Sequence, residues 1–309
     1  MARRELGPAA LRVAQAVLAA LPGGDVVVGC SGGADSLALA LGAQWAAAKT
    51  GVAVEAVTVD HGLQPGSGEV AAAVAAQLRE RGLDSRVIAV EVGEGPNLEA
   101  RAREARLAAL AASGRPVLLG HTLDDQAETV LLGLARGSGT RSLAGMSPVR
   151  GVFRRPLLGL RRAVTEQACR EWNLRAWSDP HNADERFARV RVRTRVLPVL
   201  EAELGPGVAE ALARTAEVLR ADLAAQDDPE PGQAPTARWL AGLDPAQRAR
   251  VLKGWLDDQG VAGATMGHVR AVEALVTDWR GQKGVDLRGL RVRRIDGALV
   301  AVPRPVRGS

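Results

Sequence analysis

Short apolar segments alternate with amphipathic ones through the first 135 residues, and this alternation constrains the fold more than any other feature. The first apolar segment of this pattern, residues 26–30, reads VVVGC, which is typical of a strand buried on both faces of a parallel sheet. Strands alternating with helices predict a doubly wound α/β sheet that binds ligands beyond the carboxyl ends of its strands. We predict strands at residues 26–30, 52–59, 86–91 and 116–120 and helices at residues 9–21, 35–49, 68–82, 97–113 and 123–135.

The alternation is lost beyond residue 150, where we expect the strands of this sheet to stop. A polar, proline-rich segment at residues 227–235 is the clearest domain boundary in the chain. At roughly 150 residues per domain, 309 residues suggest two domains, which we place at residues 1–225 and 226–309. We expect the second domain to be small and mostly helical, with a terminal β-hairpin that turns at Asp296-Gly297. The remaining predicted helices cover residues 161–173, 187–203, 205–225, 244–259 and 264–279, and the hairpin covers residues 285–302.

A turn rich in glycine and serine joins the strand at residues 26–30 to the next helix, and it reads Ser31-Gly32-Gly33-Ala34-Asp35-Ser36. Two glycines let the backbone approach a ligand, and N–H groups at the start of a helix bind anions. The lysine of a Walker A loop is missing, and Asp35 beside phosphates makes sense mainly if it holds Mg²⁺. The turn therefore indicates a nucleotide phosphate site, although a tight turn with a serine cap would explain the same residues without a ligand.

Polar residues also follow the second and fourth predicted strands. Asp60 and His61 come after the second strand, where a lone histidine more often has a structural role. His121 comes after the fourth strand, and three acids follow it within residues 124–128. These acids could hold magnesium or orient an amine nucleophile, but a capped helix start rich in acid would account for them as well.

Taken in order, the motifs of the chain resemble those of one family. They are SGGADS at 31–36, VDHGL at 59–63, NLEARAREAR at 97–106, HTLDDQAET at 121–129, RGSGTRSLAGM at 136–146, RPLL at 155–158, DPHN at 179–182 and an arginine-rich segment before LPVL at 197–200. The first motif resembles the pyrophosphate-binding loop, or PP-loop, of the N-type ATP pyrophosphatases. The whole ordered set resembles the tRNA(Ile)-lysidine synthetases, from about residue 26 to residue 200 and more weakly to the end. The resemblance implies a Rossmann-like PP-loop domain.

The resemblance also implies a reaction, that of an ATP-dependent C–N ligase acting on the tRNA(Ile) with a CAU anticodon. ATP adenylates the C2 oxygen of the wobble cytidine and releases pyrophosphate, which turns that oxygen into part of a good leaving group. The side-chain amine of free lysine then attacks C2, and AMP leaves. The product, lysidine, pairs with A rather than G and changes the identity of the tRNA from methionine to isoleucine. ATP and Mg²⁺ are the implied cofactors.

Carried over residue by residue, the resemblance implies three sets of site residues. The expected catalytic residues, of which the first would also bind Mg²⁺, are Asp35, Asp125, Arg103 and His121. The expected ATP-binding residues are Ser31, Gly32, Gly33, Ala34, Asp35, Ser36, Asp60, His61, Arg136 and Gly137. The expected substrate-binding residues are Glu99, Asp125, Glu128, Arg189, Arg191, Arg193 and Arg195. On spacing alone, Glu99 and Arg103 would read as an ordinary surface salt bridge.

Three positions depart from the family pattern. Thr122 replaces the second histidine of the usual HH pair, and Leu107 stands where an aromatic residue is usual. Val190 occupies the asparagine position of the RNxxR pattern. The phosphate loop and Asp125 are untouched by these departures.

Arginine dominates the basic residues of the chain, whose formal charge is +5 and whose pI is about 10.1. Lysine occurs three times, so 37 of the 40 basic residues are arginine, which binds phosphate bidentately, although high-GC codon use gives the same bias. The run FARVRVRTR at residues 187–195 reads as helix or strand, and its flanks and the family favour a helix. Because no acid interrupts the run, we expect it to bind tRNA phosphates with a steep salt dependence. A second basic patch lies in the predicted hairpin, at Arg288, Arg291, Arg293 and Arg294.

Other functions stay open on the sequence alone. A PP-loop tRNA thiolase would use the same ATP chemistry but needs catalytic cysteines or an iron–sulfur cluster, and Cys30 and Cys169 form no evident pair. An amidotransferase-like ligase would want an ammonia source and no basic tRNA surface. A non-catalytic, nucleotide-sensing RNA-binding protein could lose Asp35 and Asp125, and both are present.

The sequence also bears on the surroundings in which the chain works. No apolar run reaches the ~18 to 20 residues of a membrane helix, and no leader-like apolar block follows the basic N-terminus. Two cysteines cannot make a disulfide framework or a zinc site. We therefore expect a cytoplasmic protein with no membrane partner, and a homodimer is left open.

Overall fold

The computed structural model divides the chain into two compact units, each with its own hydrophobic core. Unit 1 comprises Met1–Leu132 and Gly145–Ala216, and unit 2 comprises Gly133–Ala144 and Glu217–Ser309. The structure describes residues 6–93, 98–178, 184–225, 232, 234–261 and 263–303. The motif DPHN and most of the proline-rich segment 227–235, including the boundary placed at residue 226, lie outside the described residues.

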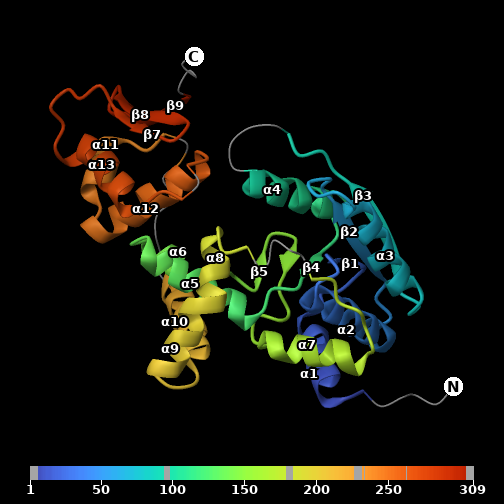
Figure 1. Ribbon diagram of the computed structural model, residues 1–309. Coiled ribbons are helices and arrows are strands. Elements are labelled where there is room, and N and C mark those ends of the chain that lie inside the picture. The colour runs from blue at the N-terminus through green and yellow to red at the C-terminus, as the bar shows by residue number, and fades with distance from the viewer. Residues whose placement is uncertain are drawn as a thin grey trace. The chain divides into compact units, whose positions relative to one another are not determined.

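Unit 1 is built on a six-stranded sheet with the strand order β3-β2-β1-β4-β6-β5 (Figure 1). The predicted parallel strands are confirmed as β1 (Val26–Gly29), β2 (Val54–Asp60), β3 (Asp84–Ala89) and β4 (Val117–Leu119). β1 pairs on one side with β2 and on the other with β4, so the chain direction around the sheet reverses at β1. Loops after the strands flanking such a reversal splay apart and leave a crevice for ligands.

The expectation that the strands stop by residue 150 is wrong. β6 (Phe153–Arg154) pairs in parallel with β4, and β5 (Val149–Arg150) pairs with β6 in antiparallel register at the edge of the sheet. Each strand has two residues, too few to show any periodicity, and they are joined by a tight turn at Gly151, whose φ is 55°.

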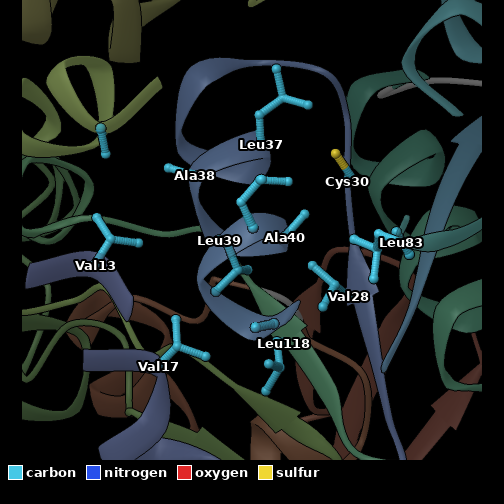
Figure 2. Close-up of a cluster of buried hydrophobic side chains, with 14 of the residues drawn as sticks. Val13, Val17, Val28, Cys30, Leu37, Ala38, Leu39, Ala40, Leu83 and Leu118 are labelled. Atoms are coloured by element: carbon cyan, nitrogen blue, oxygen red, sulfur yellow. The ribbon is translucent and has the colours of Figure 1, made fainter. Parts of the chain in front are cut away.

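Helices cover both faces of the sheet. They are α1 (Pro8–Ala20), α2 (Ala34–Thr50), α3 (Ser67–Arg79), α4 (Leu98–Ala111), α5 (Leu123–Ala135) and α7 (Arg162–Glu171). α1, α2 and α7 pack against one another on one face, where Leu37 and Leu39 are fully buried against α1 and the strands (Figure 2). On the other face, Leu110 of α4 packs against Val27 and Val57.

Truncating a side chain in this core should cost far more stability than the same change at its rim. We expect Leu39→Ala to lower the free energy of unfolding by about 3 kcal/mol, because it removes buried methyl groups and leaves a cavity. Leu11, on α1, is 37% exposed, and Leu11→Ala should cost less than about 1 kcal/mol. Urea denaturation of both variants measures the difference, and equal losses would contradict this description of the core.

The arginine run folds as a helix, as its flanks favoured. A continuous helical stretch contains α8 (Ala188–Arg191), a π-helical segment (Val192–Val196) and α9 (Leu197–Glu203), and α10 (Val208–Ala225) follows. Its apolar side chains pack on α5 in a small cluster made by Leu123, Ala127, Val192, Leu197 and Ala209.

Unit 2 contains four helices and a three-stranded antiparallel sheet among its described residues. Its elements are α6 (Thr140–Leu143), α11 (Ala237–Gly242), α12 (Pro245–Asp258), α13 (Met266–Thr277), β7 (Val285–Leu287), β8 (Leu290–Ile295) and β9 (Ala298–Pro303). The predicted hairpin turn is confirmed between β8 and β9, where both Asp296 and Gly297 have positive φ, 48° and 79°. The sequence prediction missed α6, α11 and the third strand, β7. Within the described part of the chain, no helix is both long and apolar enough to cross a membrane.

Candidate active site

A cavity of about 700 Å³ opens in unit 1 at the carboxyl ends of β1, β2 and β4. Three loops supply most of its polar wall: the loop after β1, the loop after β2 and the loop after β4. Of the sequence-predicted site residues, the cavity is lined by Ser31, Gly33, Ala34, Asp35, Ser36, Asp60, His61, His121, Asp125 and Arg193. The fold thus brings motifs from three strand ends into one cleft.

The loop after β1 is preformed by its own hydrogen bonds. The Ser36 hydroxyl accepts a hydrogen bond from the Ser31 N–H at 3.1 Å and donates one to the Gly33 carbonyl at 2.9 Å. Gly33 is the N-cap of α2, so the N–H groups of the first turn of α2 have no partner within the helix. These N–H donors and the Ser31 hydroxyl form a site for an anion at the positive end of α2, and Ser36, whose proton goes to the Gly33 carbonyl, shapes the loop.

Gly32 is required by the geometry of this loop. Its φ is +86°, and a Cβ added there would lie 2.4 Å from Cγ2 of Val74. Its carbonyl accepts a hydrogen bond at 2.9 Å from the N–H of Trp177, which also lines the cleft. Gly32 itself does not line the cavity, so it acts by letting the loop pass close to α3.

The cleft fits ATP in both its polar and its apolar parts. The loop offers backbone N–H groups and hydroxyls for phosphates, and Val57, Leu110 and Leu119 give an apolar wall for a base. The sequence prediction missed this wall. Its residues look like ordinary core positions of β2, α4 and β4, and only the fold brings them together at the cleft.

Asp35, in the first turn of α2, carries the carboxylate nearest to the loop. Its Oδ1 accepts a hydrogen bond from the Thr165 hydroxyl, and its Oδ2 lies 3.3 Å from Nε of Arg162. Burial raises the pKa of Asp35, and the hydrogen bond from Thr165 and the charge of Arg162 oppose that rise.

Asp35 fits Mg²⁺ as a single protein ligand. Among the described residues, no three His, Cys, Asp or Glu side chains cluster closely enough to hold a metal by themselves. Mg²⁺ commonly uses one or two carboxylates together with phosphate oxygens, so Asp35 beside the phosphate loop suits a nucleotide-bound ion.

Asp125 faces the cleft from the first turn of α5, where Thr122 fixes it. Its Oδ2 accepts hydrogen bonds from the backbone N–H of Thr122 at 2.8 Å and from the Thr122 hydroxyl at 3.0 Å. Its Oδ1 lies 2.9 Å from Nη2 of Arg162. Burial alone would raise the pKa of Asp125, but Arg162 and the Thr122 N–H outweigh it and hold the pKa below its usual value. Thr122 therefore has a defined place here: it caps α5 and orients the carboxylate.

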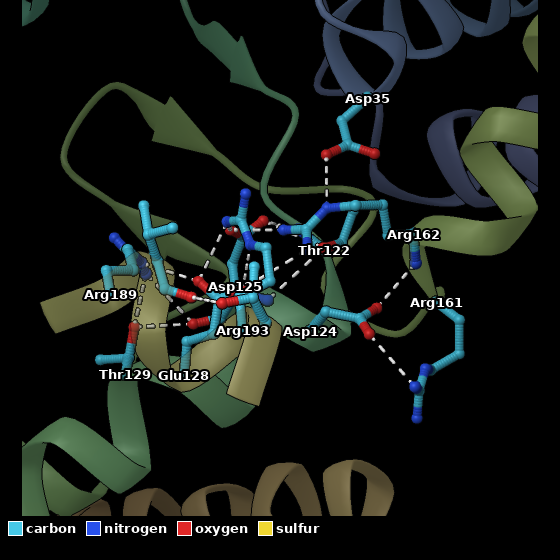
Figure 3. Close-up of polar contacts among 12 residues, drawn as sticks. Asp35, Thr122, Asp124, Asp125, Glu128, Thr129, Arg161, Arg162, Arg189 and Arg193 are labelled. Carbon is cyan, nitrogen blue, oxygen red and sulfur yellow. Dashed lines mark hydrogen bonds and ion pairs between the residues drawn. The ribbon is translucent and has the colours of Figure 1, made fainter. Parts of the chain in front are cut away.

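The other two acids of this helix play different parts (Figure 3). Asp124 accepts a hydrogen bond from the backbone N–H of Arg162 at 2.7 Å and pairs with Arg161 at 3.2 Å, so it caps the start of α7. Glu128 is fully buried and contacts Arg193 at 2.7 Å and Arg189 at 2.9 Å. Glu128 is thus placed to anchor arginines, and it does not line the cleft.

The four arginines of the helical run divide by face. Arg189 and Arg193 turn inward to Glu128, and Arg193 also lies 3.5 Å from Asp125. Arg191 and Arg195 are exposed on the other side. No acid interrupts the run along the sequence. In the folded protein, however, α5 brings Asp125 and Glu128 against it, and these acids neutralise Arg189 and Arg193.

His121 follows β4 and borders Asp125. Burial lowers the pKa of His121 to about 4, and the nearby cations Arg155, Arg103 and Arg189 add to this against the opposing effect of Asp125. Its Nδ1 is buried and has no hydrogen-bond partner in the structure. The imidazole is therefore neutral at neutral pH, able to make hydrogen bonds but weak as a general base.

The low pKa of His121 predicts a pH dependence of stability. Below about pH 6.5 His121 binds a proton in the unfolded chain but stays neutral in the folded protein. The free energy of unfolding therefore falls as the pH drops toward 4. Between about pH 7.5 and about pH 4.5, the free energy of unfolding of the unsubstituted protein should fall by about 2 kcal/mol more than that of His121→Gln. Denaturation midpoints at the two pH values measure this, and parallel losses in both proteins would contradict it.

Asp60 and His61, after β2, lie on the opposite side of the cleft. Oδ1 of Asp60 accepts a hydrogen bond from the Gly62 N–H at 3.0 Å, and this bond, with one from Ser67, lowers the pKa of Asp60. Asp60 is thus an ionised acceptor at the mouth of the cleft.

Some sequence-predicted residues lie elsewhere. Arg103 is exposed on α4 and affects His121 electrostatically but does not line the cavity, and the side chain of Glu99 lies outside the described residues. Arg136 and Gly137 belong to unit 2, where Gly137, with φ 61°, ends α5 in the left-handed conformation. Their assignment to ATP binding stays a prediction.

The two other departures from the family pattern are apolar packing positions. Val190 is buried on α8, and Leu107 of α4 packs against the cluster beneath the sheet. Both side chains are apolar, and both make packing contacts in the structure.

Comparison with known proteins first defines the class. Residues 9–200 match the model of the PP-loop domain, and residues 237–300 match the model of the TilS substrate binding domain. A U34-tRNA thiolase from Methanococcus maripaludis has the same fold, with a TM-score of 0.57 at 18% identity over 69% of this chain and 79% of its own. The chain is therefore a PP-loop protein of the ATP pyrophosphatase type.

Closer relatives define the family. A tRNA(Ile)-lysidine synthase of Mycobacterium tuberculosis is 52% identical over 90% of this chain and 91% of its own length. One from Cutibacterium acnes is 51% identical over 98% of this chain and its full length. The chain belongs to the tRNA(Ile)-lysidine synthase family of ATP-dependent ligases.

Proposed function

We propose that this protein joins free lysine to C2 of the wobble cytidine in the tRNA(Ile) with a CAU anticodon, consuming ATP and forming AMP and pyrophosphate. The observation that carries the proposal is the single cleft in which a phosphate loop and the ionised Asp125 face each other. The names of the relatives supply tRNA(Ile) and lysidine as substrate and product.

In the first step the cleft binds ATP and the C2 oxygen attacks the α-phosphate. The N–H groups that begin α2 and the hydroxyl of Ser31 hold the β- and γ-phosphates, and Ser36 lines the same site and keeps the loop in shape. Asp35 would hold Mg²⁺, whose charge offsets the negative charge that develops on the departing pyrophosphate. The P–O bond to pyrophosphate breaks as the bond from the C2 oxygen to the α-phosphorus forms.

In the second step lysine attacks C2 and AMP leaves. Asp125 is the acceptor best placed for the side-chain ammonium, because it lines the cleft and stays ionised. It orients the nitrogen and accepts the proton that the ammonium must lose before its lone pair attacks C2. As the C2–N bond forms, the C2–O bond breaks and AMP leaves with that oxygen. We propose that the exchange of an oxygen for a nitrogen at C2 switches pairing from G to A and the tRNA from methionine to isoleucine.

The tRNA backbone would be held by exposed arginines. Arg191 and Arg195 are the outward members of the helical run. Unit 2 carries the exposed Arg288 and Arg293. Arg294 is half-buried and donates to the Leu275 carbonyl at 3.2 Å, and Arg291 is paired with Asp286 at 2.5 Å. We assign tRNA binding to unit 2 in accord with its family match, and expect affinity to fall steeply with salt.

The thiolase alternative finds no support in the cysteines. Cys30 is buried against Ser36, and burial raises the pKa of its thiol. Burial also raises the pKa of Cys169 to about 12. Neither thiol is a ready nucleophile at neutral pH.

Labelled lysine tests the proposal. With ATP and Mg²⁺, the protein should incorporate lysine into a tRNA(Ile) transcript bearing CAU and not into elongator tRNA(Met), which has the same anticodon. Release of AMP without lysine incorporation would keep the adenylating step and contradict lysine as the nucleophile.

A further inference from the structure

Arg162 joins the two sides of the cleft. It is the first residue of α7, and its guanidinium lies 3.3 Å from Asp35 of α2, 2.9 Å from Asp125 of α5 and 3.4 Å from Glu128 of α5 (Figure 3). Asp35 belongs to the phosphate loop side and Asp125 to the side assigned to lysine. One side chain therefore spans the groups used in both steps of the proposed reaction.

The backbone that carries this guanidinium is fixed to the same elements. The N–H of Arg162 donates to Asp124 at 2.7 Å, and the N–H of Leu123 donates to the Leu160 carbonyl at 2.9 Å. The Thr165 hydroxyl, fully buried, contacts both the Asp35 carboxylate and the Arg162 carbonyl. The start of α7 is thus tied to α5 by one backbone–backbone bond and one bond to the Asp124 carboxylate, and to α2 through Asp35.

A guanidinium is the group that suits this position. Its planar array of donors can contact several carboxylates at once, whereas an ammonium is a point charge on a flexible stem. Half-buried carboxylates that face one another also repel, and a shared cation offsets that repulsion. Loss of the guanidinium should let Asp125 and Asp35 move apart.

We propose that Arg162 is a positioning residue, whose guanidinium holds the Asp125 carboxylate in fixed relation to Asp35 so that the amine is aligned with the adenylated carbon. This role rests on the proposed function, because it presumes that one cleft serves both steps. It concerns alignment within the cleft, so it predicts a loss of turnover with little loss of nucleotide affinity.

The neighbouring residue offers a matched control. Arg161 also pairs with three carboxylates, Asp124 at 3.2 Å, Glu201 at 3.6 Å and Glu210 at 2.9 Å. None of these lines the cleft. Arg161→Met and Arg162→Met therefore each remove three ion pairs at the start of α7. Only Arg162→Met removes a cation that lines the cleft.

The experiment compares Arg162→Met, Arg162→Lys and Arg161→Met in the full chain. Calorimetry gives the Kd of Mg·ATP, thermal melts give stability, and lysine incorporation gives kcat and KM. We expect Arg162→Met to lower kcat by about 100-fold, the cost of misplacing a reacting group by about 1 Å, with Kd within about threefold of the unsubstituted value. The kcat of Arg162→Lys should lie between those of Arg162→Met and the unsubstituted protein. Arg161→Met should keep kcat within about threefold of the unsubstituted value.

Equal losses of kcat in Arg161→Met and Arg162→Met would overturn the proposal, as would a loss confined to stability or to Mg·ATP affinity. If Arg162→Met does not melt cooperatively, Arg162→Lys decides: full kcat contradicts the proposal, and reduced kcat with unchanged Kd supports it. Failure of the unsubstituted protein to incorporate lysine would contradict the proposed function instead. Arg162 would then be judged by AMP release in the presence of tRNA, where the same ranking of variants is expected.

Discussion

Replacing Asp125 with asparagine is expected to slow lysine transfer by about 100- to 1,000-fold. The amide has nearly the same shape and can still accept from Thr122, but it carries no charge to hold an ammonium or to pair with Arg162. Mg·ATP affinity should stay within about threefold, because Asp125 is not part of the phosphate loop. Single-turnover lysine incorporation and calorimetry measure the two quantities separately.

Asp84→Asn is the control for this variant. Asp84 is exposed at the start of β3, and the same chemical change there should leave both quantities unchanged. If Asp125→Asn transferred lysine within about tenfold of the unsubstituted rate, Asp125 could not be the carboxylate that holds the attacking amine.

Gly32→Ala is expected to weaken Mg·ATP binding by about 10- to 100-fold, since a strained backbone position costs of order 1 to 3 kcal/mol. The added methyl would meet Val74 at 2.4 Å in a backbone conformation, φ +86°, that alanine rarely adopts. The loop must therefore shift away from α3 and lose the alignment of its N–H donors. Calorimetric titration with Mg·ATP measures the change.

Two further variants separate the clash from the strain. Gly51→Ala places the same methyl at φ +75° with nothing within 4 Å, at the end of α2, so it should cost stability and leave ATP binding unchanged. Adding Val74→Ala to Gly32→Ala removes the nearest atom and should restore part of the affinity. Unchanged affinity in Gly32→Ala would contradict the description of the loop.

The parallel sheet was predictable because its central strands, β1 and β4, are buried on both faces. Continuous apolar runs such as residues 26–30, each closed by glycine or a polar turn, leave few alternatives once helices separate them. β5 and β6 could not be found this way, since two residues carry no period and their pairing depends on β4. α6 and α11 were missed for a related reason, being four and six residues long.

Some residues of the candidate site were likewise predictable from the sequence, and others were not. Ser31, Asp35, Asp60 and His121 were predictable because each lies at or within a few residues of the end of a strand, and the ends of parallel strands share one edge. Arg162 was not, because 127 residues separate it from Asp35 and its own neighbours in sequence read as an ordinary helix start. The cap on its N–H comes from Asp124 of α5, 38 residues away, so it leaves no local signal in the sequence.

The arginine run shows the limit of reading charge from sequence. The flanks of the run correctly favoured a helix, but the sequence could not show that Glu128 of α5 lies against Arg189 and Arg193. A buried carboxylate is expensive unless it is paired, and Glu128 with its arginines meets that requirement. The arginines that we propose for tRNA binding are those on the outer face.

The most direct test of the central claim is the chemical identity of the product. After incubation with tRNA(Ile) bearing CAU, lysine, ATP and Mg²⁺, nuclease digestion and mass spectrometry should reveal a cytidine that has gained one lysine and lost one water. That nucleoside should map to the wobble position and be absent when Asp125→Asn replaces the protein. An unmodified wobble cytidine, or lysine found at another nucleotide, would contradict the account.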